Sequence, residues 1–513
     1  MRRGIKGHEI AKNIISVSGI VIFAKLLGFV KQMVMAGSFG ATIETDLISL
    51  SQNLIGDMDY LLVQVLITAF IPIYIEVKKE SGKKASAFVS NTLVSCLIAS
   101  ALIIAVLFIS APFIAGIIAP AYTEELHASL IRYIRLYVPT ILPMLVCAVF
   151  NALLRANKHF VPGELVSVIQ SATVILLTLF LSKRAGVKAL VISYFAYTVM
   201  NTVFLTLSAR REWTFLREGR LYDSYSVRLF KMAFPLFFGY AMIFINQQVD
   251  KVIVSGLGEG VVTAVGYAAV LSNLVATLTG TICSVIFSYV SQHVADGREE
   301  EAGNMIRKSA VVFTTLLVPV CILILFNAGD IVKIVYGRGA FSDTAVKSTA
   351  MALVGYGVSV VFYAYRELFG RLQYSYHDSR QPMINSSIGI VFNVAFSIIL
   401  SRFLGVLGVT LASSFSVMIC AVLNILSARR HNKYIRMGTA LRYLPYWIAG
   451  GAVCAFISVQ GAAFLADANT FLRFMVVLAV SFMVYGIMCG PVFLLEKGEN
   501  SNCRKGKRNA KQI

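Results

Sequence analysis

Residues 86–118 read SAFVSNTLVSCLIASALIIAVLFISAPFIAGII and contain no Asp, Glu, Lys or Arg. About 20 consecutive apolar residues make a helix long enough to cross the hydrocarbon core of a bilayer. A helix also satisfies its own backbone hydrogen bonds where no water can reach them. This stretch is therefore predicted to be a transmembrane helix.

Similar apolar stretches fill most of the chain, which is 57% hydrophobic and has a mean hydropathy of +0.75. With boundaries uncertain by a few residues, the predicted helices span 13–37, 45–76, 86–118, 128–156, 162–182, 189–209, 229–257, 261–293, 309–336, 344–374, 382–401, 405–428, 441–465 and 471–495. A soluble protein would not carry so many. The sequence predicts an all-α polytopic membrane protein with about fourteen transmembrane helices.

Basic residues indicate the orientation of these helices. Lys and Arg gather in every second loop, whereas the loops 38–44, 119–127 and 258–260 have none. Because cytoplasmic loops are enriched in Lys and Arg, both termini are predicted to be cytoplasmic. Lys183, Arg184 and Lys188 are the exception. The net charge of +20 follows mostly from this pattern, so nucleic-acid binding is not predicted.

Nothing in the sequence indicates catalysis or a metal centre. The eight Cys residues are scattered without a CxxC pair, and none of the six His residues is paired at metal-ligand spacing. There is no nucleotide-binding glycine loop or nucleophile motif, and the loops are too short for a catalytic domain. We expect a protein that is not an enzyme and has no cofactor.

The chain carries a weak internal repeat, which chance similarity among apolar helices would also explain. Residues 30–40 and 249–258 match in pattern with one gap, and six predicted helices separate them. A parallel repeat of this kind places a substrate cavity between two halves. The expected domains are a first six-helix lobe (1–211), a second six-helix lobe (212–436), two further helices (437–495) and a basic cytoplasmic tail (496–513). The tail is expected to be disordered and attracted to anionic lipid.

The chain resembles the MurJ (MviN) family of lipid II flippases, within the multidrug, oligosaccharidyl-lipid and polysaccharide exporter superfamily. The resemblance covers nearly the whole chain in order. The stretches that carry it are KLLGFVK at 25–31, Phe39-Gly40, Thr45-Asp46, AFIP at 69–72, Ile245-Asn246, VDK at 249–251, GEG at 258–260, Tyr267-Ala268, YGRGAFS at 336–342 and YHDSRQP at 376–382.

This resemblance implies a flippase of the bacterial cytoplasmic membrane. It would move a polyprenyl-diphosphate-linked saccharide, first of all the peptidoglycan precursor lipid II, to the outer leaflet by alternating access. Its partners would be that substrate, membrane lipids and the cell-wall synthesis machinery. The last two helices, with Gly450-Gly451 allowing close approach, would form a groove for the lipid tail.

Two departures from the family pattern keep other functions open. The family's Pro-Asn-Leu-Leu-Arg-Arg segment reads Gln52-Asn53-Leu54-Ile55-Gly56-Asp57 here, and an Arg of the family is replaced by Val270. A flippase for another lipid-linked oligosaccharide (O-antigen, capsule or exopolysaccharide type) is therefore the first alternative. A cation-coupled drug exporter is the second. A membrane-bound glycan polymerase or ligase would require a larger outer loop than this chain has.

Ionisable residues inside the predicted helices are candidate substrate ligands, because each costs about 2.5–3.5 kcal/mol at the bilayer centre unless it faces a partner or water. The predicted substrate-binding residues are Lys25, Lys31, Asp46, Asp57, Asp59, Arg366 and Glu367. Arg366 suits a diphosphate because its fork holds two oxygens at once.

Each cation also has a structural alternative. Lys25 would pair with Asp57 or Asp59, and Lys31 would extend to the membrane surface. Arg366 would pair with Glu367, although adjacent helical residues point about 100° apart and would make a poorly aimed pair.

By the resemblance, Asp250 and Asp378 would hold a coupling ion, Na⁺ or H⁺. Carboxylate oxygens suit a hard cation such as Na⁺. The structural alternative is that Asp378 caps the helix that begins near Pro382.

Overall fold

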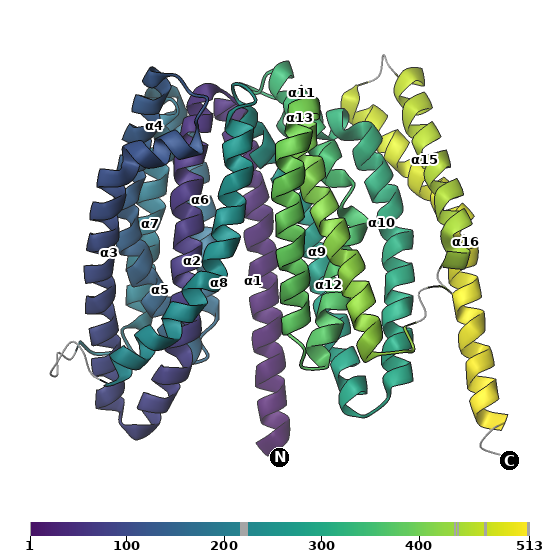
Figure 1. The fold of residues 1–513 in the computed structure, drawn as a ribbon, viewed down its shortest axis with the longest axis horizontal. Helices are drawn as coiled ribbons and strands as arrows, with labels where there is room; N and C mark the ends of the chain where they lie inside the picture. The colour runs from purple at the N-terminus through teal and green to yellow at the C-terminus, as the bar shows by residue number, and fades with distance from the viewer. Residues whose placement is uncertain (1, 216–223, 436–437, 439–440, 466–468, 510–513) are drawn as a thin grey trace. The chain divides into compact units, whose positions relative to one another are not determined.

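The computed structural model describes residues 2–215, 224–435, 438, 441–465 and 469–509, although not the side chains of 2–18, 243, 441, 462 and 493–509. In these ranges the chain forms α-helices and two short 3-10 segments and no strand (Figure 1). Twelve helices are long and apolar enough to cross a membrane, or 13 if one bent pair counts as a single span. The predicted all-α polytopic class is confirmed.

The helices of the first half have the following bounds: α1 Arg2–Phe39, α2 Ile43–Glu80, α3 Gly82–Ile118, α4 Glu124–Tyr137, α5 Ile141–Ala156, α6 Val161–Ala185 and α7 Lys188–Ala209. Those of the second half are α8 Ser224–Ser255, α9 Val261–Ala295, α10 Glu299–Tyr336, α11 Asp343–Gly357, α12 Val360–Ser375, α13 Arg380–His431, α15 Leu444–Phe464 and α16 Thr470–Asn509. The 3-10 segments are η1 Val138–Thr140 and η2 Leu441–Tyr443.

Two predicted spans are interrupted in the structure. The span 128–156 is divided by η1, which contains Pro139, since proline lacks the N–H that a continuous helix needs. The span 344–374 is the bent pair α11 and α12, which meet at 42°. Conversely, α13 joins two predicted spans through Gly405, whose φ of 55° only glycine adopts without strain. A turn at Gly405 makes α13 two spans and brings the total to the fourteen that were predicted.

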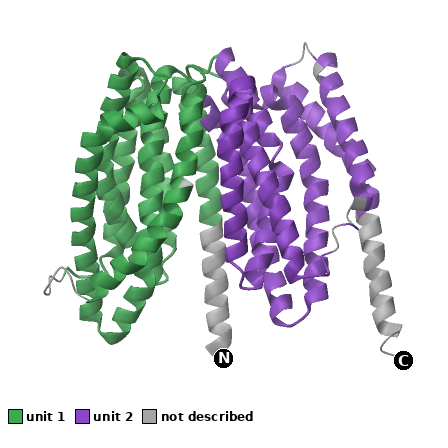
Figure 2. Cartoon of the chain, in the orientation of Figure 1, with its two compact units in different colours: residues 1–263, 338–342 green, residues 264–337, 343–513 purple. Residues whose placement is uncertain are grey.

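The chain packs as two compact units, which Figure 2 colours separately. Unit 1 comprises residues 1–263 and 338–342, and unit 2 comprises residues 264–337 and 343–513. α8 belongs to unit 1 because it packs against α2 and α3. The packing units divide at Thr263, and the lobe boundary that the repeat predicts at residue 211 stays a prediction. Position 436 of the predicted second boundary lies outside the described residues, and the repeat itself stays a prediction.

Within unit 1, α1 packs along α6, and α2 contacts α3, α4, α5 and α8. In its core, Phe70 stacks on Tyr74 and Phe88, with ring centroids 5.6 and 5.1 Å apart. Offset stacks of this kind stabilise a core beyond the apolar area that they bury.

Within unit 2, α10 contacts α11, α12, α15 and α16, and α12 packs along α13. Trp447 of α15 donates to Thr315 Oγ1 of α10 at 2.9 Å. A Cβ at Gly450 would lie 2.9 Å from the Tyr485 ring, so glycine there lets α15 approach α16 closely. The close approach expected at Gly450 is thus present. α16 extends to Asn509, so most of the tail that was expected to be disordered has helical backbone.

The motif YGRGAFS at 336–342 serves packing inside each unit. In unit 1, Ala340 N–H donates to Gly37 O at 2.9 Å, and a Cβ at Gly339 would lie 2.1 Å from the same oxygen. Gly339 has φ 62°, a conformation that favours glycine. In unit 2, the buried Tyr336 packs on Tyr267, with ring centroids 4.9 Å apart.

Candidate functional site

Asp57 of α2 is held by two side chains of α8. It pairs with Lys251 and accepts a hydrogen bond from Gln248 Nε2 at 2.8 Å. About a quarter of the Asp57 side chain is exposed. The pair forms because α8 packs against α2 inside unit 1. Lys251 belongs to the motif VDK at 249–251 and was not among the predicted substrate-binding residues.

Lys25 of α1 is exposed and has no ion pair among the described side chains. The alternative that Lys25 pairs with Asp57 or Asp59 is therefore wrong in this structure. The cation that pairs with Asp57 is Lys251. Lys31, six residues further along α1, is half-buried and also has no ion pair in the described part of the chain. α1 thus contributes two uncompensated cations.

Asp59 is half-buried in α2. It lies near Tyr194 and Tyr197 of α7 and Cys147 of α5. The described residues give it no hydrogen-bond partner, and both tyrosines are almost fully buried. Asp59 therefore lies near α5 and α7, whereas Asp57 is bound by side chains of α8.

Asp46 has a structural role that the sequence did not indicate. Its side chain is fully buried, and its Oδ1 accepts a hydrogen bond of 2.8 Å from the backbone N–H of Thr263. Thr263 lies in the first turn of α9, where unpaired N–H groups favour a carboxylate. The predicted role of Asp46 in substrate binding does not fit, because a buried side chain used in this way cannot reach a substrate.

Unit 2 holds a cluster of three charges on α12. Arg366 donates to Glu367 at 3.2 Å, and Arg371 donates to the other Glu367 oxygen at 3.4 Å. The Arg366 guanidinium also lies 4.5 Å from the centroid of the Tyr363 ring, a cation–π contact. A quarter to a third of each charged side chain is exposed. Two cations around one acid leave a net positive charge.

The geometry of this cluster differs from the prediction in two ways. Arg366 does pair with its neighbour Glu367, because the long arginine side chain overcomes the 100° separation. Arg371 was missed, although the spacing from Glu367 is the i, i+4 spacing that favours such a pair. Asn424 of α13 donates to the carbonyl of Arg366 at 3.2 Å and receives a bond of 2.8 Å from Asn385, which fixes α12 against α13.

The carboxylates expected to hold a coupling ion differ in environment. Asp378, in the turn between α12 and α13, accepts from the Gln381 N–H at 3.0 Å and pairs with His431 at 2.8 Å. The bond from Gln381 holds the pKa of Asp378 below its usual value, and His431 adds to the effect. The structural alternative, a cap on α13, therefore holds. Asp250 is half-buried near the end of α8.

The described residues contain no group of three or more His, Cys, Asp or Glu side chains that could hold a metal. What each unit offers chemically is positive charge inside membrane-spanning helices. Lys25 and Lys31 supply it in unit 1, and the α12 cluster supplies it in unit 2. Arg and Lys bind phosphate through charge-assisted hydrogen bonds, so each set suits an anionic phosphate group.

Proteins of similar sequence are described as flippases. A probable lipid II flippase MurJ of Borreliella burgdorferi is 24% identical over 409 residues, which are 78% of this chain and 79% of the relative. One from Thermotoga maritima is 26% identical over 399 residues, covering 77% of this chain and 80% of the relative.

The fold is similar to solved transporter structures. Lipid II flippase MurJ in an inward closed conformation matches with a TM-score of 0.78 at 20% identity, over 93% of this chain and 99% of that one. An inward-facing multidrug resistance MATE family transporter of the MOP superfamily matches at 0.64 and 13% identity, over 83% and 99%. The family model described as "Lipid II flippase MurJ" matches residues 35–488. This chain therefore belongs to the lipid II flippase MurJ family.

Proposed function

We propose that this protein is a flippase that moves lipid II across the bacterial cytoplasmic membrane by alternating access. The observation that carries the proposal is the family match over residues 35–488. The relatives from Borreliella burgdorferi and Thermotoga maritima, described as probable lipid II flippases, support the same substrate.

The uncompensated cations have a role in this function. The diphosphate of lipid II is anionic, and a cation held inside a membrane-spanning helix is retained only where it faces a partner or water. Arg366 and Arg371 share a single carboxylate, so an incoming diphosphate can replace Glu367 as the partner of Arg366. Lys25 requires no such exchange because no side chain in the described part neutralises it.

The remaining parts of the proposal concern orientation and energy. The basic loops favour cytoplasmic termini, and the substrate is handed to the cell-wall synthesis machinery on the outer side. Asp250 and Asp378 remain the two candidates for a Na⁺ or H⁺ site, and at Asp378 the ion would have to replace the partners of both oxygens. An ion can bias the return step only by its differential affinity for the two states.

A specific observation favours the first alternative, a flippase for another lipid-linked oligosaccharide. The segment that is basic in the family ends here in Asp57, and Asp57 neutralises Lys251. Unit 1 thus lacks the two arginines that the family has at positions 56 and 57, and the charge of Lys251 is neutralised as well. A drug exporter of the same fold would not require the uncompensated cations of α1 and α12.

Depletion of the protein in its own host tests the substrate directly. If it flips lipid II, lipid II should accumulate in the inner leaflet and become inaccessible to an added outer-leaflet probe, and peptidoglycan synthesis should stop. Re-expression of wild type should reverse the accumulation, and the Arg366→Ala variant should not. Accumulation of a different lipid-linked saccharide, with lipid II unchanged, would assign the first alternative.

A further inference from the structure

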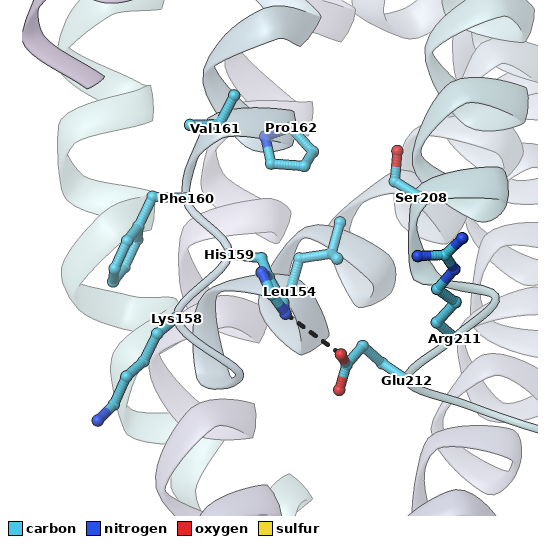
Figure 3. Close-up of a pocket in the computed structure, with 9 residues that line it drawn as sticks. All are labelled: Leu154, Lys158, His159, Phe160, Val161, Pro162, Ser208, Arg211 and Glu212. Atoms are coloured by element: carbon cyan, nitrogen blue, oxygen red, sulfur yellow. Dashed lines mark hydrogen bonds and ion pairs between the residues drawn. The ribbon is translucent and has the colours of Figure 1, made fainter. Parts of the chain in front are cut away.

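Unit 1 has a cavity that none of the proposed transport residues lines. Its volume is about 480 Å³, within the range of ~300–1,000 Å³ typical of small-molecule sites. Figure 3 shows its walls: the end of α5, the turn into α6 and the segment after α7. The lining residues are Leu154, Lys158, His159, Phe160, Val161, Pro162, Ser208, Arg211 and Glu212. We infer that this cavity binds the phosphate of an anionic membrane lipid.

The charges of the cavity favour an anion. Glu212 is already used, because it pairs with His159 at 3.2 Å, drawn in Figure 3, and lies 3.8 Å from Lys78. Lys158 and Arg211 line the same cavity, and neither has an ion pair among the described side chains. Two exposed cations are thus available to a ligand.

Lys158 occupies a position that suits glycine. It has φ 65°, in the left-handed region. His159 N–H donates to Leu154 O at 2.8 Å, and Lys158 N–H donates to Arg155 O at 3.0 Å. These two bonds form the Schellman motif that ends many helices, usually with glycine at the left-handed residue. A lysine there strains the backbone, and such strain concentrates at functional sites.

The amino-terminal end of α6 adds to the preference of the cavity for an anion. Val161 and Pro162 line the cavity at its first turn, and no side chain caps this end. The amino-terminal end of a 25-residue helix carries partial positive charge, which attracts a phosphate.

The apolar surface next to the cavity favours a lipid over a soluble phosphate. Val199, Val203 and Leu207 form a stripe at four-residue spacing along α7, and about half of each side chain is exposed. This stripe leads to Ser208 and Arg211 at the cavity. Phe160, which also lines the cavity, is 41% exposed. An acyl chain along this stripe would bring its headgroup phosphate to Lys158 and Arg211.

The test uses the full-length protein in nanodiscs of phosphatidylcholine with increasing phosphatidylglycerol, and native mass spectrometry to count the phosphatidylglycerol retained. Lys158→Gly removes the charge and relieves the backbone strain, so the variant should melt no lower than wild type. Each cation removed should weaken retention about fivefold. Arg211→Gln should therefore match Lys158→Gly, and the neighbouring Arg210→Gln is the control because Arg210 does not line the cavity.

Competition distinguishes the sources of phosphate. Retention that inorganic phosphate and polyprenyl diphosphate do not displace, and that falls in Lys158→Gly and Arg211→Gln alone, supports a membrane-lipid site. Displacement by inorganic phosphate would contradict the assignment of a lipid as the ligand. Displacement by polyprenyl diphosphate would show that the cavity is a substrate site. Equal retention by wild type and both variants would overturn the site itself.

Discussion

The Asp57–Lys251 pair of unit 1 and the Arg366–Glu367–Arg371 cluster of unit 2 are both partly exposed charge groups in membrane-spanning helices. Their charge balance differs. Asp57 and Lys251 neutralise each other across two helices, whereas the three residues of α12 keep a net positive charge on a single helix. A balanced pair stabilises the packing of α2 against α8, and an unbalanced cluster is suited to a ligand. We predict that this difference separates residues that hold the fold from residues that bind substrate.

Arg366→Ala should have the largest effect on function. Without its fork, the diphosphate loses a bidentate partner, and flipping should fall at least 100-fold while the protein still reaches the membrane. The measurement is complementation of a depleted strain together with protein level in the membrane fraction. Arg402→Ala, at an exposed position of α13, is the matched control. Wild-type flipping by Arg366→Ala would show that the unbalanced cluster is structural too.

Lys25→Ala should lower flipping about tenfold, which corresponds to about 1.4 kcal/mol. The reason is that Lys25 is exposed and has no ion pair in the described part of the chain, so no structural role competes with binding. Lys25→Arg keeps the charge and should retain most of the activity. The same complementation assay measures both, and equal loss in the two variants would argue against a phosphate ligand at this position.

Lys251→Met should mainly affect stability. It leaves Asp57 partly buried without its cation, at a cost of about 1–3 kcal/mol given its partial exposure. The thermal midpoint in detergent should fall and should recover in the Asp57→Asn, Lys251→Met double variant. A double variant that is stable but cannot flip lipid would show that the Asp57–Lys251 pair takes part in substrate binding and not only in packing.

Asp378→Asn should have the smallest effect, because Asp378 lies in the turn between α12 and α13 and not inside a membrane-spanning helix. The pKa of Asp378 is lowered in the folded protein. Its contribution is therefore present above the unfolded value of about 3.9 and is lost as the pH falls through the lower folded value. Wild type should lose more thermal stability between pH 6 and pH 3 than Asp378→Asn, and His431→Gln should be intermediate. Identical pH profiles would contradict the assigned cap.

Much of the fold was predictable because it depends on local sequence. Length and apolar content determine which segments cross a bilayer, and the predicted spans match the helices apart from their ends and breaks. The breaks depend on packing as well as on residue type. Pro139 interrupts one span, but Pro72 and Pro112 lie inside continuous helices.

The candidate site was predictable in composition but not in pairing. The intramembrane ionisable residues stand out in an apolar sequence, and most were named in advance. Their partners were not, apart from the Arg366–Glu367 pair weighed as an alternative. The α2–α8 contact joins Asp57 to Lys251, which lies 194 positions further along the chain. Asp46 accepts a hydrogen bond from a backbone N–H of α9.

By itself, then, the sequence determined that this chain is a multi-span helical membrane protein with charged groups inside its spans, because hydrophobic length and the cost of buried charge are local properties. Only the tertiary structure decided which charges are neutralised and which remain available. That outcome depends on which helix faces which, and helix packing is set by the shapes of many side chains together. The same holds for the cavity at Lys158, whose walls come from three segments of the chain.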